Sequence, residues 1–515
     1  MAHTYVDLGE NGSSVYLYAF DPGEGQFKRA RQVLWGDWLR LADHRRHPAV
    51  GPEWLAINWA PRTEDRILYI PREHTTDRRP LEIIFLDVGQ GDGAVLITPE
   101  RDADEKIVVI DAGDSSHMRA FLDGRFRAYR GFQFEAAIMT HPDTDHYRGF
   151  RTIFSDSRIG FNTVYHNGLV ERPTGSGYDK VGGLTEDPPG SGQYYIEDLA
   201  VDRADILRHF DNASTFGNYR FAPIMHSALH NPLIGDIRML STDSAHSIHV
   251  DGRAYLPEFA PRPDRPYSIE VLGPVVEFGA SNLPRLRRIS SNYNKTKNGH
   301  SIILRLHFGK YRILFGGDLN VPAEKYLLSR YAGLPAFPRR GTPDYDRMME
   351  ETPHWFRAEV LKVCHHGSEK VTDEFLDVVH PACFVISSGD QEGHVHPRPD
   401  LLGRLGKAGR GAAPVILATE LQRSTRELED PANVKELNDE IDVLAREGGS
   451  ADLLRSIRER IRKLARTNVD VYGAIYLKTD GERLITAFKL EELSDKKKWF
   501  YYEYVIDEAG ELELR

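Results

Sequence analysis

The feature that most constrains this chain is the segment Thr140–His146, which reads THPDTDH. It directly follows the apolar run Ala136–Met139, which predicts a buried strand, and Pro142 interrupts the hydrogen bonding of that strand. Two imidazoles and two carboxylates therefore share one loop at a strand end. Zinc and manganese accept both kinds of ligand. A solvated acidic turn is the alternative, but four such groups so close together favour a metal site.

Composition and charge exclude several classes of protein. The chain has no run of the roughly 18–20 apolar residues that a membrane helix needs, and its first residues lack the pattern of a secretory signal. The two cysteines, Cys364 and Cys383, form neither a disulfide framework nor a CxxC pair, so we expect a reducing, cytoplasmic location. The formal net charge is −11, so a nucleic-acid partner would have to be held by a local basic patch or by metal ions.

A chain of 515 residues is expected to form more than one structural unit. Residues 1–80 form a small N-terminal extension, whose tryptophans we expect in a core. Residues 81–425 alternate strands and helices and form the main α/β domain, with a long loop insert at 169–265 that would be a lid, a substrate wall or disordered. Apolar helical faces predict a helical hairpin at 426–467, and 468–515 return to strands that close the main domain. The extension and the hairpin are the surfaces expected to dock a protein partner.

Several separate segments share one pattern, in which a strand is followed by His, Asp or Gly. Each has an ordinary alternative, since Gly-Asp is a common turn and a pair of histidines can cap a helix. Strand ends converge on one edge of a sheet, so we expect these segments to meet. Together they supply enough ligands for two metal ions: Asp87–Asp92, His141–His146, Asp318, His365–His366 and His394–His396.

The segment His141–His146 resembles the HxHxDH signature of the metallo-β-lactamase fold, with Asp143 in place of the middle histidine. This variant, with the motifs around it, resembles the soluble nuclease-like domain of the ComEC-type competence proteins, which internalise DNA. The motifs that agree in order are DVGQGD at 87–92, GD at 317–318, KVCHHGS at 362–368 and GHVHP at 393–397. The resemblance implies a metallo-β-lactamase αββα sandwich over about 81–395. No membrane channel accompanies it, so DNA uptake itself does not carry over.

The resemblance also implies roles for individual residues. The implied metal ligands are His141 and Asp143 for the first ion, Asp145 and His146 for the second, Asp318 as the bridge, and His396, with His394 as the competing choice, to complete the second site. One ligand of the first ion stays open among His300, His226 and His230, with His166, a water or Lys362 as weaker choices. His366, with His365 beside it, would donate a proton to the leaving group. Asp92 and Asp111 would orient ligands from outside.

The chemistry implied by these residues is metal-assisted hydrolysis. Two cations about 3.5–4 Å apart lower the pKa of a shared water, so a metal-bound hydroxide would be the nucleophile. The extra carboxylate, Asp143, favours manganese or magnesium over zinc and therefore phosphodiester substrates. With the basic segment 285–297 nearby, the sequence predicts a phosphodiesterase or nuclease acting on DNA or RNA. The alternatives are a hydrolase of a cyclic nucleotide, lactone or thioester, and a metal-bound scaffold subunit.

Overall fold

The computed structural model describes residues 2–9, 14–59, 66–101, 104–126, 131–279, 282–389, 396–411, 413–419, 443, 473–490, 494–508, 510 and 512–515. The helical hairpin predicted at 426–467 lies outside these residues apart from Val443, and so does His394. Within the described residues, no helix has the length and apolar character needed to cross a membrane.

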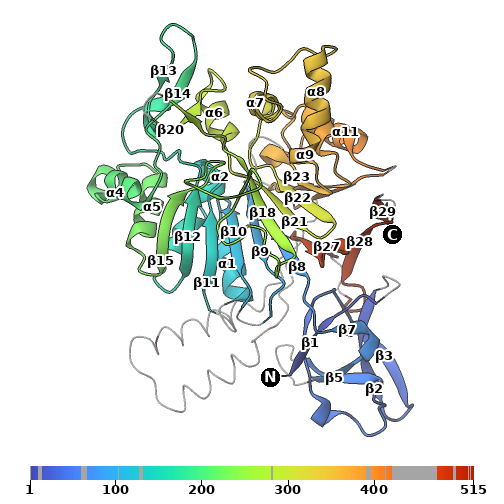
Figure 1. The fold of residues 1–515 in the computed structure, drawn as a ribbon. Coiled ribbons are helices and arrows are strands. Elements are labelled where there is room, and N and C mark those ends of the chain that lie inside the picture. The colour runs from blue at the N-terminus through green and yellow to red at the C-terminus, as the bar shows by residue number, and fades with distance from the viewer. Residues whose placement is uncertain are drawn as a thin grey trace.

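Two β-sheets pack face to face at the centre of the protein (Figure 1). Across the first sheet, the described strands are β15 (Ile234–Met239), β12 (Gly160–His166), β11 (Gln133–Ile138), β10 (Ile107–Ala112), β9 (Gly93–Ile97), β8 (Leu81–Phe85), β26 (Ile475–Thr479), β27 (Arg483–Lys489), β28 (Trp499–Ile506) and β29 (Leu512–Leu514). Strands β10, β11, β12 and β15 run parallel. Their almost continuous apolar sequence suits a sheet that is covered on both faces. The C-terminal strands join this sheet through β26, which pairs with β8.

The second sheet has the same mixed character. Its described strands, in order, are β16 (Ile248–Val250), β17 (Arg253–Tyr255), β18 (Tyr267–Gly273), β21 (Ile303–Phe308), β22 (Tyr311–Phe315), β23 (Val360–Lys362), β24 (Cys383–Ile386) and β25 (Val415–Ala418). Those from β22 to β25 are parallel. Ile83 and Leu96 from the first sheet share a buried core with Leu304 and Ile313 from the second, which holds the two sheets together.

Helices cover the outer face of each sheet. On the first sheet these are α1 (His117–Arg125), α3 (Phe150–Phe154), α4 (Arg203–Phe210) and α5 (Phe221–His230). On the second they are α7 (Val321–Tyr331), α8 (Pro343–Glu351), α9 (Pro353–Phe356), α10 (Asp373–Val379) and α11 (Pro399–Ala408). In α5, Phe221, Ile224, Met225 and Ala228 recur at helical spacing and are buried against the sheet. The layers are therefore α, β, β and α, as predicted.

The insert at 169–265 differs from its prediction as a long loop. It contains α4, α5 and β15, and β15 extends the first sheet. Ile206 and Phe210, four residues apart, bury one face of α4, which is why this segment packs against the sheet. The insert also contributes β13 (Thr185–Glu186) and β14 (Tyr194–Ile196) to a small sheet with β20 (Pro284–Arg287) and β19 (Glu277–Phe278).

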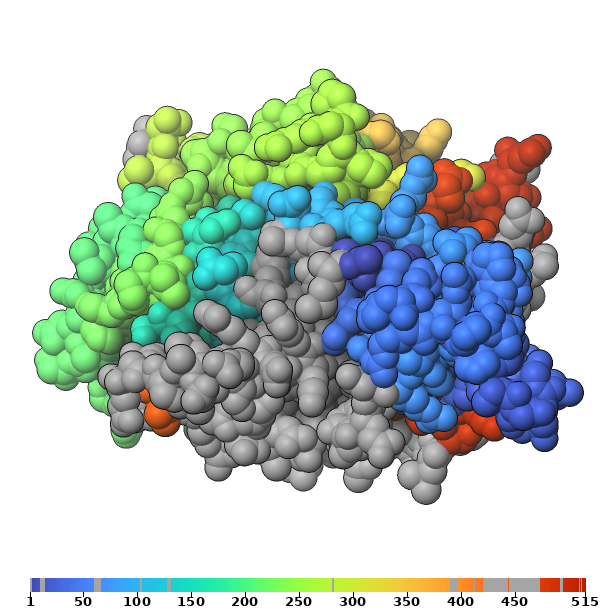
Figure 2. Space-filling model, turned by 90° about the horizontal axis from the view of Figure 1, so that it is seen from below, coloured from blue at the N-terminus to red at the C-terminus, as the bar shows by residue number. Residues whose placement is uncertain are grey.

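The N-terminal extension forms two small sheets. One comprises β4 (Trp38–Arg40), β1 (His3–Val6) and β7 (Thr75–Thr76), and the other comprises β3 (Gln26–Val33), β2 (Val15–Asp21), β6 (Arg66–Pro71) and β5 (Trp54–Trp59). Figure 2 shows this extension in blue beside the C-terminal strands in red. Gln32 Nε2 donates to the Trp499 carbonyl at 3.2 Å, and Lys478 Nζ donates to the Trp35 carbonyl at 2.8 Å. The extension is thus fixed to the first sheet.

Candidate metal centre

The ligand-rich segments meet at one end of the sandwich, near α2 (Thr144–Tyr147), α6 (Tyr293–Gly299) and the start of α7 (Figure 1). The loop after β11 carries His141–His146, and the turn after β22 carries Asp318. After β23 the chain makes a short 3-10 turn, Cys364–Gly367, that carries the two adjacent histidines. Side chains from both sheets therefore face one another here.

Asp318 lies at the centre of this site, and its two carboxylate oxygens face different groups. Oδ1 is 3.3 Å from His146 Nε2 and 3.4 Å from His366 Nε2. These two nitrogens are 3.2 Å apart, and Asp145 Oδ2 lies 3.5 Å from the His366 nitrogen. We call this group, made of His146, His366, Asp145 and Asp318 Oδ1, the second position.

The other oxygen of Asp318 faces a looser group. Oδ2 is 3.8 Å from His141 Nε2 and 3.8 Å from His365 Nε2. Asp143 Oδ2 lies 3.4 Å from the same nitrogen of His141. We call His141, Asp143, His365 and Asp318 Oδ2 the first position. Asp318 thus lies between two sets of donors, where a bridging ligand would lie, and His365 lies where the sequence left a ligand unassigned.

Hydrogen bonds fix the tautomers of the histidines in the second position. His146 Nδ1 donates to Asp111 Oδ2 at 2.8 Å, and His366 Nδ1 donates to Asp92 Oδ1 at 3.0 Å. An ionised carboxylate only accepts, so each Nδ1 carries a proton, and each Nε2 is the nitrogen that would offer a lone pair to a cation beside Asp318. Asp111 and Asp92 therefore orient ligands from outside, which is how metal-binding histidines are commonly held.

His141 is oriented by hydroxyl groups. Its Nδ1 lies 3.2 Å from Thr140 Oγ1 and 3.3 Å from Ser301 Oγ. Both hydroxyls donate elsewhere, Thr140 to Asp111 Oδ2 at 2.7 Å and Ser301 to the Asn298 carbonyl at 2.7 Å. Their oxygens are therefore free to accept from His141 Nδ1, and His141 Nε2 also presents a lone pair to the site.

Two buried atoms show that these residues fit divalent cations. Within the described part of the chain, His141 Nε2 and Asp318 Oδ1 have no hydrogen-bond partner of good geometry. Leaving a buried polar atom unsatisfied costs about 1–3 kcal/mol, and a cation between the donors would satisfy both atoms. Burial lowers the pKa of His146 and of His366, but Asp318 and the carboxylates on their Nδ1 atoms raise both well above the usual value. The site therefore attracts positive charge.

Asp92 also comes close to the second position. One of its carboxylate oxygens lies within 4.8 Å of ligand atoms of His146, Asp318 and His366. Its oxygens, however, accept from Lys362 Nζ and His366 Nδ1. Burial raises the pKa of Asp92, but Lys362 and then His366 more than offset this and lower it to about 2. We therefore assign Asp92 and Lys362 to the orientation of His366 and not to metal binding.

The backbone of the site is strained where it presents these groups. Asp111, His365 and His366 have φ angles of 53°, 52° and 53°, in the left-handed region that residues with a Cβ rarely adopt. Such strain costs about 1–3 kcal/mol per residue and clusters at functional sites. At Gly91 a Cβ would lie 1.6 Å from the backbone oxygen of Asp145, so only glycine allows this close approach.

Most of the remaining predicted ligands have other partners. His300 Nε2 donates to the Arg287 carbonyl at 2.7 Å and turns away from Asp318. His166 is a core residue whose pKa burial lowers to about 3. His226 and His230 contact each other on α5, with ring centroids 4.1 Å apart. His396, predicted to complete the second position, lies beside His365 at a ring-centroid distance of 6.2 Å, and its place as a ligand stays a prediction. His366, predicted as the proton donor, contributes Nε2 to the second position.

Sequence reasoning missed one pair of residues in this site. Lys297, on α6, places Nζ 2.5 Å from Asp143 Oδ1 and 2.9 Å from Glu171 Oε1. In the sequence, Lys297 stands out only as part of the basic segment 285–297. Other cations of that segment are also paired, because Arg285 contacts Asp187 and Glu197, and Arg287 contacts Glu277. This segment therefore offers less free positive charge than its composition indicates.

A family model described as Metallo-beta-lactamase superfamily matches residues 94–357, just over half of the chain. The chain belongs to the metallo-beta-lactamase superfamily. Members of this superfamily are generally hydrolases, and with the Asp and His cluster around Asp318 this indicates a metal-dependent hydrolase with divalent metal ions. A search of the curated proteins found no match.

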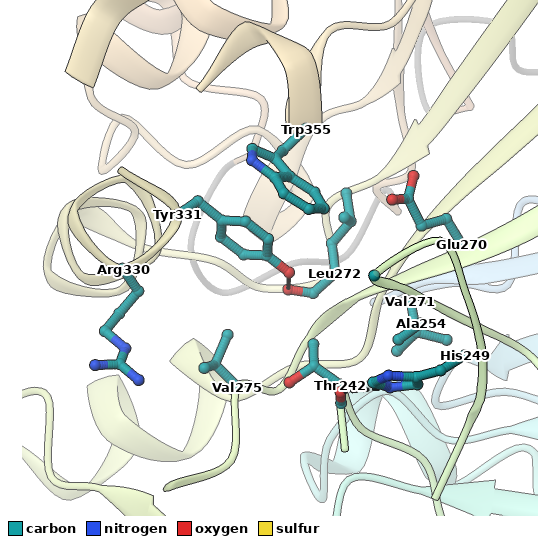
Figure 3. Close-up of a pocket in the computed structure, with 11 residues that line it drawn as sticks. Thr242, His249, Ala254, Glu270, Val271, Leu272, Val275, Arg330, Tyr331 and Trp355 are labelled. Atoms are coloured by element: carbon teal, nitrogen blue, oxygen red, sulfur yellow. Dashed lines mark hydrogen bonds between the residues drawn. The ribbon is translucent and has the colours of Figure 1, made fainter. Parts of the chain in front are cut away.

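A separate hollow of about 180 Å³ lies beside strands β17 and β18 of the second sheet of this metallo-beta-lactamase sandwich (Figure 3). Tyr331 and Trp355 form one wall, Leu272 lies beside them, and Val275 lies below them. Two of its polar groups are engaged within the protein, since Tyr331 Oη donates to the Leu272 carbonyl at 2.9 Å and Glu270 accepts from Arg305 at 2.7 Å. The Asp318 site is therefore the candidate for catalysis.

Proposed function

We propose that this protein is a phosphodiesterase that cleaves DNA or RNA with two divalent metal ions. The observation that carries the proposal is the pair of donor groups on either side of Asp318. When bound, two such cations would lower the pKa of a shared water and neutralise charge that develops on the phosphoryl oxygens.

The donor types support a phosphodiester substrate. Three carboxylates, Asp143, Asp145 and Asp318, face the two positions, and oxygen ligands favour manganese or magnesium over softer cations. The order of the motifs resembles that of the nuclease-like domain of ComEC-type competence proteins, which supports the same chemistry. The stack of Arg288 on Tyr194, with Cζ 4.0 Å from the ring centroid, offers a surface on which a base could pack.

The two adjacent histidines divide their tasks in this proposal. The His366 side chain is only 3% exposed and uses Nδ1 on Asp92, so we assign it to the second position and not to proton donation. His365 is 29% exposed and faces Asp318 Oδ2. Burial, more than offsetting the effect of Asp318, lowers the pKa of His365, so its imidazole is neutral at pH 7, as a metal ligand requires.

A second candidate is a small-molecule hydrolase acting on a cyclic nucleotide, lactone or thioester. The net charge of −11 and the internal pairing of Arg285, Arg287 and Lys297 favour it, because a long polyanion needs free positive charge along its path.

The test is hydrolysis by purified protein supplied with manganese, magnesium or zinc. The substrates are single- and double-stranded DNA, RNA, cyclic dinucleotides and a lactone panel. We expect nucleic-acid cleavage that requires added metal and falls to the metal-free level in Asp145→Ala and Asp318→Ala. Asp344→Ala, an exposed carboxylate on α8, is the matched control and should keep full activity. Circular dichroism should show all three variants folded.

Each other outcome points to a different function. Cleavage confined to cyclic dinucleotides or lactones would replace the nuclease proposal with the small-molecule candidate. Absence of hydrolysis, combined with a protein partner that still binds the Asp145→Ala and Asp318→Ala variants, would indicate a scaffold that docks through the N-terminal extension or the segment 426–467.

A further inference from the structure

Lys297 places a fixed positive charge against the first position. Its side chain is 6% exposed, and Nζ lies 2.5 Å from Asp143 Oδ1. The other oxygen of Asp143 faces His141 Nε2 at 3.4 Å. One carboxylate is therefore shared between a built-in ammonium and the place where a metal ion would bind. The commoner superfamily signature, with histidine at this point, has no charge for such a lysine to pair with.

The second position has different surroundings. Asp145 Oδ2 lies 3.4 Å from the Gln90 side-chain amide, which carries no charge. Lys362, the buried lysine on that side, contacts Asp92, which holds His366 from outside. The donors of the second position are also closer together than those of the first, with contacts of 3.2–3.5 Å against 3.4–3.8 Å.

Glu171 moderates the effect of the Lys297 ammonium on the first position. Glu171 Oε1, 2.9 Å from Nζ, also accepts from Tyr293 Oη at 3.2 Å. Asp143 brings the Lys297 ammonium close to the first position, so the ammonium repels a cation that binds there. The negative charge of Glu171 offsets part of this repulsion.

We propose that Lys297 makes the first position bind its cation more weakly than the second, so that the two positions fill in order as the metal concentration rises. Lys297 is a positioning residue, because its contacts are with Asp143 and Glu171 and not with the reacting atoms. This inference rests on the metal binding in the proposed function and not on its substrate.

The test is a calorimetric titration of metal-stripped, full-length protein with Mn²⁺ in the absence of substrate. We expect one tight and one weak binding step in the unaltered protein. Lys297→Met removes the charge and keeps the aliphatic stem, so the weak step should tighten at least tenfold and the tight step should change less. Glu171→Gln leaves Lys297 less compensated and keeps the acceptor for Tyr293, so the weak step should weaken severalfold. Lys297→Arg should keep two unequal steps.

Opposite shifts in Lys297→Met and Glu171→Gln separate an effect of charge from damage to the site. Lys295→Met, an exposed lysine two residues away, is the matched control and should titrate as the unaltered protein does. The inference is overturned if Lys297→Met leaves the weak step unchanged or weakens it, or if both substitutions shift it in the same direction. Two unequal steps without any nucleic-acid cleavage would refute the proposed substrate alone, and equal steps with cleavage would refute this inference alone.

Discussion

Asp111→Asn tests whether an outer carboxylate sets the metal affinity of the second position. Asp111 accepts from the Thr140 backbone N–H at 2.8 Å, the Thr140 hydroxyl at 2.7 Å and His146 Nδ1 at 2.8 Å. If the new amide faces His146, the imidazole must move its proton to Nε2, which removes the lone pair that faces Asp318. If the amide faces the Thr140 N–H instead, two donors oppose each other. The first arrangement removes a lone pair that would bind the cation, and the second leaves buried donors unsatisfied.

The size of this loss sets the expected effect. An unsatisfied buried polar group costs about 1–3 kcal/mol, which corresponds to roughly 5- to 150-fold in a dissociation constant. The backbone at this residue has φ of 53°, which asparagine tolerates well, so the substitution adds no new backbone strain. The tight Mn²⁺ step should weaken by this factor, measured by competition with a chromogenic chelator. Asp123→Asn, a carboxylate on α1 that pairs with Arg119, is the control. A tight-step affinity within twofold of the unaltered protein would refute the tautomer argument.

Two further substitutions test the structure around the site. Burial raises the pKa of Glu324 to about 8 from 4.5, so the folded protein holds a proton that the unfolded chain releases, and stability is lost as pH rises from about 4.5 to 8. Glu324→Gln should therefore stabilise the protein by an amount that is absent at pH 4.5 and reaches about 3 kcal/mol at pH 7, seen as a rise in the melting temperature. A rise in melting temperature that does not depend on pH would contradict this. Gly91→Ala should displace Asp145 and weaken Mn²⁺ binding at least tenfold. The control is Gly403→Ala, where a Cβ would have no heavy atom within 4 Å, and it should leave Mn²⁺ binding unchanged. Equal Mn²⁺ titrations for both variants would show that the close approach at Gly91 is unimportant.

The strands of the sandwich were readable because they are short apolar runs that end in turn-forming residues. The segments Leu81–Phe85 and Tyr311–Phe315 lie where their composition predicts them. Helices α7, α8 and α9, which lie between Asp318 and Val360, are harder to predict from the sequence. Helix α8 buries only Met348, with Tyr345 and Met349 packed partly beside it, so its apolar face is short. Its place depends on the neighbouring helices more than on its own pattern.

The sequence by itself determined which residues are available to form the site. The density of ligand types in His141–His146, and the repeated placement of Asp and His after strands, follow from the order of residues alone, because a strand and the loop after it are local structures. The choice of Asp143 in place of histidine is also visible there.

Only the tertiary structure decided which of these groups face one another. His366 lies beside His146, and Lys297 meets Asp143 across segments far apart in the chain. A side chain's partners depend on how two sheets are stacked and on how strained turns aim neighbouring residues, as at His365 and His366. These are long-range packing effects that residue spacing does not encode, and they determine the charge that each metal position would meet.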